Sequence, residues 1–238
     1  AVNKSGSTLT EKSKTLQTRT VEFTTTATAT KSSLLLGKAD GYRILSVKMK
    51  SGTFSSPGST YSIDISDRYE FDSGQRTTHY DIARLVLKPS YSAPTAPIEV
   101  VYEYFTHSTG DYFTVNSYPS NVAYQSIPYF EGISLRDCID FRPRISDDGA
   151  AFSGAGSSMS LAPKRGIDIR ADFTYYLARK TKIAVDINGN FFAIDGVSSL
   201  NPGDPLDPSM GMVLYNLTLE PYTFSAGSSG VVIEPVDN

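Results

Sequence analysis

The sequence of 238 residues contains no tryptophan, a single cysteine and only two histidines. One cysteine, Cys138, cannot form a disulfide within the chain, so stability must come from packing, oligomerisation or a bound ion. No apolar run approaches the roughly 18 to 20 residues that a membrane-spanning helix needs. The net charge is −3 and no basic stripe is visible. We therefore expect neither membrane insertion nor nucleic acid as a partner.

Residues that favour β structure are abundant. The chain has 15 Tyr and 12 Phe, which suit a pleated, half-buried surface, and 18 Gly and 13 Pro, which mark turns. Alternation of apolar and polar residues predicts strands that bury one face, and continuous apolar runs predict central strands. The alternating segments are 45–50, 61–66 and 167–177, the more apolar one is 98–105, and 213–219 is one more predicted strand.

Two hairpins are predicted from turn residues. Asn188-Gly189 lies between segments 182–187 and 191–197, and this pair supplies the positive φ angles of a tight hairpin turn. Residues 107–110 resemble a second turn, after which 111–115 would return along the preceding strand.

Helical signals are sparse. Only 134–140 is expected to form a short helix or turn, and the stretches 146–163 and 201–208 are expected to be loops. Many short strands with frequent turn signals are typical of sandwich or barrel folds. The predicted fold class is mainly β, an antiparallel β-sandwich-like module or modules with long loops and little helix.

The domain organisation follows from composition. Residues 1–20 are polar and are predicted to be a flexible arm or linker, whereas 21–238 form the β-rich module. Residues 24–30 favour an exposed edge strand or an extended connector. Three prolines at 89–97 allow a split of the module near residue 90. The chain starts with Ala and ends in Val-Asp-Asn, so we expect a segment of a longer polypeptide.

Searches for catalytic and metal motifs give weak candidates. His107-Ser108 and Asp111 have the residue types of a Ser-His-Asp site, but neighbours on one turn rarely have its geometry, and no G-x-S-x-G motif is present. Residues 186–190 resemble the start of a calcium loop, yet an EF-hand needs Gly and Glu where Phe191 and Val197 stand. We predict a non-enzymatic protein without cofactor, catalytic residue or metal site, although a glycosidase carboxylate pair is not excluded by sequence.

One motif concentrates charge among apolar residues. Arginine forms bidentate bonds to carboxylates, and such pairs fix loops or subunit contacts. We predict a structural ion-pair network formed by Arg136, Asp137, Asp140, Arg142 and Arg144.

Four aromatic residues occupy a proline-punctuated stretch. They are candidates for a glycan or interface contact surface, with packing in the core as the competing interpretation. These residues are Tyr118, Tyr124, Tyr129 and Phe130.

Several long motifs occur in a fixed order along the chain. They lie at 69–76, 80–81, 84–89, 104–107, 110–118, 135–144, 172–177 and 196–202. Together they resemble segments of large structural proteins of contractile-tailed bacteriophages, cyanophages among them, over roughly residues 60–238.

The resemblance implies a virion component, and it assigns no catalytic role to any residue of this chain. It would lie in the tail, as a tail-fibre or baseplate-associated protein, and serve assembly and scaffolding. The implied partners are other phage tail proteins and further copies of the chain, with a trimer as one arrangement. The alternative is a receptor- or glycan-binding module that attaches to a host surface glycan. Members of this family are longer than 238 residues, which fits a segment of a larger protein.

Overall fold

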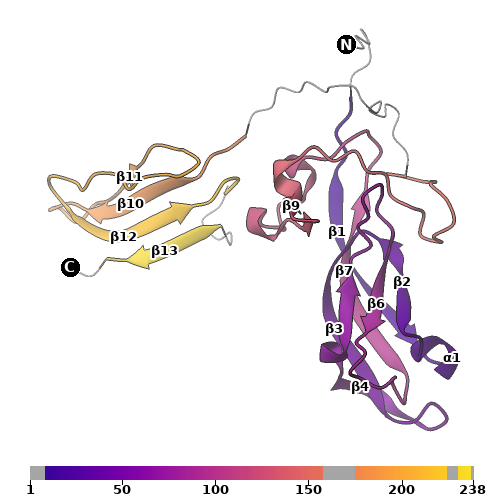
Figure 1. Cartoon of the computed structure of the whole chain (residues 1–238). Coiled ribbons are helices and arrows are strands. Elements are labelled where there is room, and N and C mark those ends of the chain that lie inside the picture. The colour runs from indigo at the N-terminus through magenta and orange to yellow at the C-terminus, as the bar shows by residue number, and fades with distance from the viewer. Residues whose placement is uncertain (1–8, 158–174, 224–229, 237–238) are drawn as a thin grey trace. The chain divides into compact units, whose positions relative to one another are not determined.

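The computed structural model describes residues 9–157, 175–223 and 230–236. The chain forms two compact units. Unit 1 comprises Ala1–Asn121 and Pro128–Ile167, and unit 2 comprises Val122–Ile127 and Asp168–Asn238. Both are built from antiparallel strands with little helix (Figure 1), which confirms the predicted fold class.

The larger sheet of unit 1 has the strand order β1-β7-β3-β4. Its central strand β7 pairs along its whole length with β1, from Lys14 opposite His107 to Phe23 opposite Ile98. The predicted strands at 45–50 and 98–105 are confirmed by β3 and β7. The bounds are β1 Lys14–Phe23, β7 Ile98–His107, β3 Gly41–Gly52 and β4 Pro57–Asp64.

A second sheet of unit 1 has the order β2-β6-β5. Its strands are β2 Ser33–Ala39, β6 Ile82–Leu87 and β5 Tyr69–Asp72. Apolar side chains of both sheets form one core, with Leu34 and Leu85 from the smaller sheet and Val47 and Val100 from the larger. Full burial of such a side chain contributes roughly 1.5–3 kcal/mol, so this core is the main source of the unit's stability.

Short elements complete unit 1. A short helix or turn is predicted at 134–140, and the 3₁₀ turn η4 within this segment confirms it. The short elements are α1 Thr26–Ala29, η1 Ser66–Arg68, η2 Val115–Ser117, β8 Tyr129–Phe130, β9 Ile133–Ser134 and η4 Leu135–Asp137. No helix in the described part of the chain is long and apolar enough to cross a membrane.

The N-terminal segment differs from the prediction. Residues 14–20 are not a linker but part of β1, because their backbone groups pair with β7 despite the polar side chains. Residues 26–29 form the helical turn α1 instead of a strand. Thr25 caps this turn, with its hydroxyl 2.9 Å from that of Thr28, and Ala29 is fully buried.

The hairpin predicted after β7 is wrong. Beyond residue 110 the chain does not return along β7, because both edges of β7 are already paired, with β1 and with β3. Tyr112 instead forms a bridge with Glu11, and Phe113 forms one with Asp140.

In the strands predicted at 45–50 and 61–66, two apolar residues are exposed. Ile63 lies on the edge strand β4 and is 37% exposed. Leu45 is 48% exposed because the register shifts there: Ile44 lies opposite Tyr102 and Ser46 opposite Val101. The extra residue of such a bulge is turned out of the regular alternation.

Unit 2 contains a sheet of order β11-β10-β12-β13 and the short turn η3 (Tyr124–Ser126). The predicted hairpin is confirmed by β10 and β11, and the strand at 213–219 by β12. The bounds are β10 Arg179–Val185, β11 Phe191–Asp195, β12 Met212–Leu219 and β13 Val231–Pro235.

The turn between β10 and β11 is longer than a two-residue hairpin loop. Gly189 has a φ of 84°, but Asn188 is not left-handed. The carboxylate of Asp186 accepts hydrogen bonds from the backbone N–H of Asn188 at 2.8 Å and of Asn190 at 2.9 Å, which closes the loop.

Two further expectations concern the boundaries. A split near residue 90 is not seen among the described residues, since β6 and β7 on either side of it belong to unit 1. Most of the strand predicted at 167–177 lies outside the described residues, and 175–177 are not part of a strand.

Candidate functional site: a buried charged cluster

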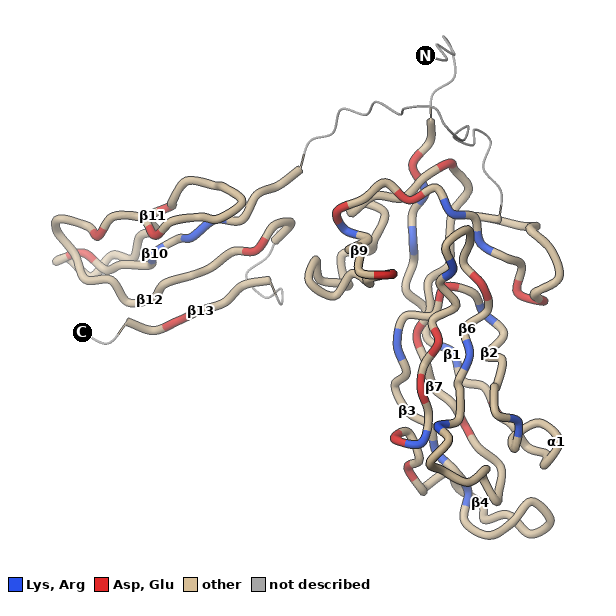
Figure 2. Tube along the Cα trace, in the orientation of Figure 1, with Lys and Arg blue, Asp and Glu red and all other residues tan. Residues whose placement is uncertain are grey.

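Charged side chains from distant parts of unit 1 meet at one end of its larger sheet. Asp40 directly follows β2, and its Oδ2 accepts hydrogen bonds from Lys14 Nζ at 2.7 Å and His107 Nε2 at 2.6 Å. All three side chains are at most 1% exposed. Figure 2 shows acidic and basic stretches of the trace close together beside the start of β1. We call Lys14, Asp40, Tyr80, His107, Asp140 and Arg142 the buried charged cluster.

The backbone turns Asp40 into this position. Its φ of 55° lies in the left-handed region, which Asp tolerates better than most residues. Its carbonyl accepts the N–H of Phe105 at 2.9 Å, and the N–H of Gly41 donates to Ser73 at 2.8 Å. The carboxylate is thereby held at the junction of the two sheets.

A second ion pair continues the cluster. Arg142 Nη2 donates to Asp140 Oδ2 at 2.8 Å, and Tyr80 donates its hydroxyl proton to the same carboxylate. The Tyr80 hydroxyl also accepts from Lys14 Nζ and from Arg142 Nη2, each at 3.2 Å, so it joins the two ion pairs. Arg142 further donates to the carbonyl of Arg76 at 2.9 Å and to Gln75 Oε1 at 3.2 Å.

Aromatic rings surround the ammonium group of Lys14. Its Nζ lies 4.2 Å from the ring centre of Tyr80, 4.8 Å from that of Phe113, 4.9 Å from that of Tyr118 and 5.3 Å from that of Phe105. Ring faces attract a cation within about 6 Å, more strongly where water is excluded. The rings therefore replace part of the hydration that Lys14 loses on burial.

Lys12 and Gly156 lie next to the cluster and contact each other. Lys12 is 1% exposed, and its Nζ lies 3.5 Å from the carbonyl of Gly156. Burial lowers the pKa of Lys12, although Asp140 and Asp111 oppose the effect. A Cβ at Gly156, whose φ is 75°, would come within 2.4 Å of the Cβ of His107. Only glycine fits there without displacing the histidine.

Burial fixes the charge state of the cluster. It lowers the pKa of His107 to about 4, against the opposing effect of Asp40, so the ring is neutral at pH 7. A neutral ring that donates from Nε2 to Asp40 leaves Nδ1 as a buried acceptor, and Nδ1 has no hydrogen-bond partner. Burial tends to raise the pKa of Asp40, but Lys14 and the His107 hydrogen bond outweigh it and lower this pKa.

The same balance holds at the other pair. Burial tends to raise the pKa of Asp140, but the opposing effects of Arg142 and the Tyr80 hydroxyl are together larger, so this pKa is lowered. The pKa of Tyr80 is well above its ordinary value, mainly because the ring is buried. Two carboxylates thus face two cationic side chains in a site that is largely shielded from solvent.

The cluster is suited to holding chain segments together. A general base or nucleophile must reach a substrate, and these side chains are shielded from solvent. The segments that it joins are 12–14, 40, 75–80, 107–113 and 140–142. Breaking a buried ion pair by removing one partner costs several kcal/mol, so each contact constrains the arrangement of the five segments.

The structure separates the five residues of the predicted ion-pair network into pairs. Asp140 and Arg142 belong to the buried charged cluster. Arg144 pairs instead with Asp147, which also binds Lys38. Arg136 and Asp137, adjacent in sequence, pair at 3.4 Å, with the Asp137 side chain 57% exposed.

The four candidate aromatic residues have different surroundings. Tyr118 faces Lys14 and packs edge-on against Phe105, with ring centres 5.5 Å apart. Tyr124 lies in unit 2, where it stacks on Tyr222 at 5.3 Å. The other two form β8: Tyr129 is 59% exposed, whereas the ring of Phe130 lies 4.7 Å from the guanidinium of Arg142.

Sequence reasoning missed Lys12, Lys14, Asp40 and Tyr80. Charged residues in a polar N-terminal stretch are normally solvated, and no local pattern distinguishes these. The one available signal is that Lys12 and Lys14 are two residues apart and so share a face if the segment is a strand.

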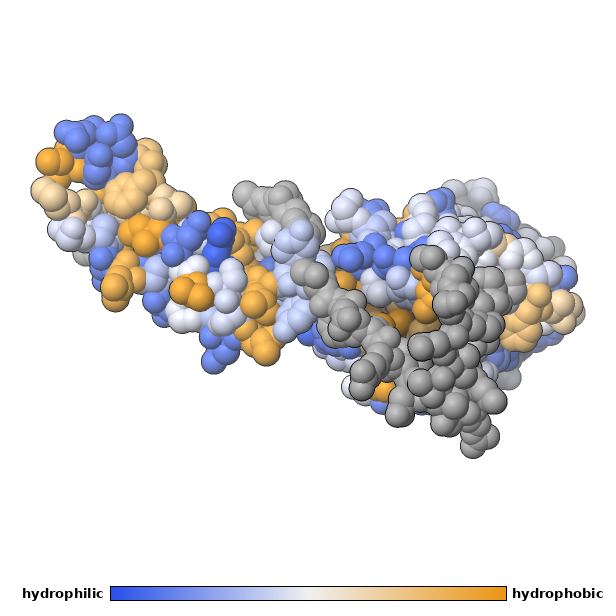
Figure 3. Space-filling model, turned by 90° about the horizontal axis from the view of Figure 1, so that it is seen from above, coloured by the Kyte–Doolittle hydropathy of each residue, from blue (hydrophilic) through white to orange (hydrophobic). Residues whose placement is uncertain are grey.

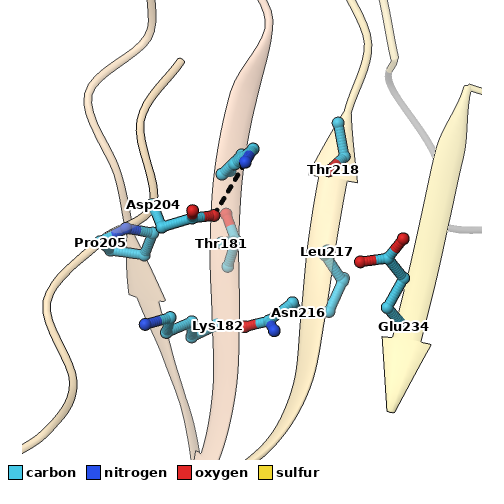
Figure 4. Close-up of a pocket in the computed structure, with 9 residues that line it drawn as sticks. Thr181, Lys182, Asp204, Pro205, Asn216, Leu217, Thr218 and Glu234 are labelled. Atoms are coloured by element: carbon cyan, nitrogen blue, oxygen red, sulfur yellow. Dashed lines mark ion pairs between the residues drawn. The ribbon is translucent and has the colours of Figure 1, made fainter. Parts of the chain in front are cut away.

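Unit 2 has a shallow polar hollow with a volume of about 280 Å³. The segment 201–208 contains three prolines, and we call it the proline-rich loop. Figure 4 shows its Asp204 directed toward β10, where it pairs with Lys180 at 2.9 Å. Lys182 pairs with Asp207 of the same loop at 2.5 Å. These ion pairs tie the loop to one face of the sheet.

Metal binding finds no support in the described residues, among which no group of three or more His, Cys, Asp or Glu side chains is placed to hold an ion. Comparison with known proteins gives no relative: no family model, no curated protein and no solved structure matches the chain.

Proposed function

We propose that the chain is a structural component of the tail of a contractile-tailed bacteriophage, in a tail fibre or associated with the baseplate. Its role is assembly and scaffolding, and it needs no cofactor. The assignment to a virion rests on the resemblance of the ordered motifs within residues 69–202 to phage structural proteins. The scaffolding role rests on the buried charged cluster.

The observation that carries the scaffolding role is that the charged groups of the cluster pair with one another inside unit 1. Lys14, Asp40, His107, Asp140 and Arg142 bind one another and lie in the interior. Their effect is to hold five segments of unit 1 in one arrangement. A rigid unit of this kind suits a protein that presents fixed surfaces to other tail proteins and to further copies of itself.

The alternative, a receptor- or glycan-binding module, has less support. It requires the candidate rings to form one exposed stacking surface. Tyr118 is directed into the cluster and Phe130 lies against Arg142, which leaves Tyr129 as the largely exposed ring among the candidates in unit 1. A glycan array separates the two proposals. Saturable, sugar-competed binding that is lost in Tyr129→Ala would favour attachment over scaffolding.

Mass spectrometry of purified virions tests the main proposal. We expect peptides of this chain in virions of a phage that encodes it, at a stoichiometry fixed relative to other tail proteins. Antibodies against the chain should label the tail in electron micrographs. Detection of the chain in infected cells but not in purified virions would refute the proposal.

A further inference from the structure

The two faces of the unit 2 sheet differ in what covers them. Residues paired across antiparallel strands point to the same side, so the register defines each face. Lys180, Lys182 and their cross-strand partners form the face on which the proline-rich loop is fixed by ion pairs. The opposite face includes six large apolar residues, which we call the apolar face: Ile183, Val185, Phe191, Tyr215, Leu217 and Ile233.

Among the described residues of unit 2, part of the apolar face is exposed and the rest is half-buried. Phe191 is 73% exposed, Ile233 56% and Tyr215 44%. Figure 3 shows apolar side chains at the surface of this part of the chain. The charges on this side, Arg179 and Asp195, lie at one end of the face and pair with each other at 3.3 Å. Thr181 lies beside this pair and donates its hydroxyl to Asp195 at 2.8 Å. The six residues of the apolar face carry no charge.

We infer that the apolar face of unit 2 is an interface that binds the same face of a second copy of the chain. Two such sheets would pack face to face about 10 Å apart as a two-layer sandwich related by a two-fold axis. The inference deepens the assembly role proposed above and rests on it, and the second copy would supply a layer over the apolar face.

The choice of a second copy rests on charge and area. A neutral apolar face is complementary to itself, whereas a charged partner would leave its own charges unpaired against it. Four strands about 4.8 Å apart and about six residues long give a face on the order of 400 Å² in projection. Two such faces bury on the order of 1,000 Å² of accessible surface, the lower end for a specific interface. We therefore expect a weak, concentration-dependent dimer.

Light scattering coupled to size exclusion tests the inference with the full chain over a series of concentrations. The mass should rise from 25.9 kDa toward twice that value as the concentration increases. The variant Phe191→Lys/Ile233→Lys places two cations on the apolar face and should weaken the dimer at least tenfold. The matched control Val197→Lys/Leu206→Lys changes two residues of unit 2 that are 84% and 87% exposed but lie on loops, and it should dimerise like the wild type.

Cross-linking gives a second readout. In a Cys138→Ser background, Tyr215→Cys near the centre of the face should form a disulfide between copies on oxidation, whereas Leu206→Cys should not. A chain that is monomeric at every concentration, forms a trimer, or dimerises equally well with the two lysines present would overturn the inference. The result does not depend on whether the chain is found in virions, so the two proposals fail separately.

Discussion

Units 1 and 2 are both antiparallel, yet they cover their sheets differently. In unit 1 the smaller sheet packs on the larger one, and the core between them includes fully buried residues such as Leu34, Val47 and Val100. In the described strands of unit 2, Ala184 is the one apolar residue that is fully buried. Unit 1 thus buries its apolar side chains in a core of its own, whereas the described strands of unit 2 leave apolar side chains such as Phe191 and Ile233 exposed. Burying these side chains against a second surface would stabilise unit 2.

The substitution with the largest expected effect breaks the buried charged cluster of unit 1. Lys14→Met removes the main cation facing Asp40 and leaves a buried carboxylate with only a neutral histidine. We expect the free energy of unfolding of unit 1 to fall by about 3–5 kcal/mol. Hydrogen exchange of the β7 amides should report this loss, while the β10 and β12 amides keep their protection. Lys31→Met, at an exposed position of unit 1, is the control and should change neither.

A pair of leucine truncations compares the two units directly. Leu85→Ala opens a cavity in the core of unit 1, where Leu85 is 1% exposed, and should destabilise that unit by about 2–5 kcal/mol. Leu206→Ala, at a residue of unit 2 that is 87% exposed, should change stability by less than about 0.5 kcal/mol. Denaturant unfolding of both variants measures the difference. Equal losses would mean that Leu206 is covered in solution.

Acid should destabilise unit 1 specifically. His107 takes up a proton near pH 6.5 in the unfolded chain but only near pH 4 in the folded one. Between these values the unfolded state binds more protons, so the free energy of unfolding of unit 1 falls as the pH drops from about 6.5 to 4, by an amount on the order of 2–3 kcal/mol. Unfolding at several pH values tests this.

Substitutions assign that pH dependence to one residue. His107→Gln should flatten the dependence between pH 6.5 and 4, whereas His79→Gln should keep it, because His107 is still present. Unit 2 contains no histidine and should show no transition of this origin. An unchanged slope in His107→Gln would assign the effect to other groups.

The smallest expected effect concerns the hairpin of unit 2. Gly189 and Gly203 both have open space around the position of a Cβ, but only Gly189 has a left-handed φ, of 84°. Gly189→Ala should therefore destabilise unit 2 by about 1 kcal/mol through backbone strain, and Gly203→Ala should be nearly neutral. Thermal unfolding of the two variants isolates the backbone contribution, since the added methyl group is the same.

The sequence predicted the fold class and several strands because local rules decide them. Period-two alternation at 45–50, the apolar run at 98–105 and Asn188-Gly189 each specify local structure that the fold retains. The prediction of a return strand at 111–115 failed because a strand can pair only with a free edge, and both edges of β7 are occupied. The prediction of a flexible linker at 14–20 failed because the backbone of this polar segment pairs with β7 and forms a strand.

The site was harder to predict than the fold. The pairing of Asp140 with Arg142 could be predicted from the sequence because their motif concentrates opposite charges among apolar residues. Lys14 and Asp40 were not, since they are 26 positions apart and each looks solvated in its own segment. Their burial depends on four aromatic rings that only the folded chain brings around Lys14.

The contact between Lys12 and Gly156 has a mechanical consequence. These residues are 144 positions apart in the sequence, yet only 3.5 Å separates Lys12 Nζ from the Gly156 carbonyl. Tension applied between these two residues would therefore load one end of the unit rather than the length of its sheet. The first strand would peel from β7 starting at the Lys14–His107 pair, one hydrogen bond at a time. The charged cluster lies at that starting point, so its rupture force sets the pull that unit 1 withstands before it unravels.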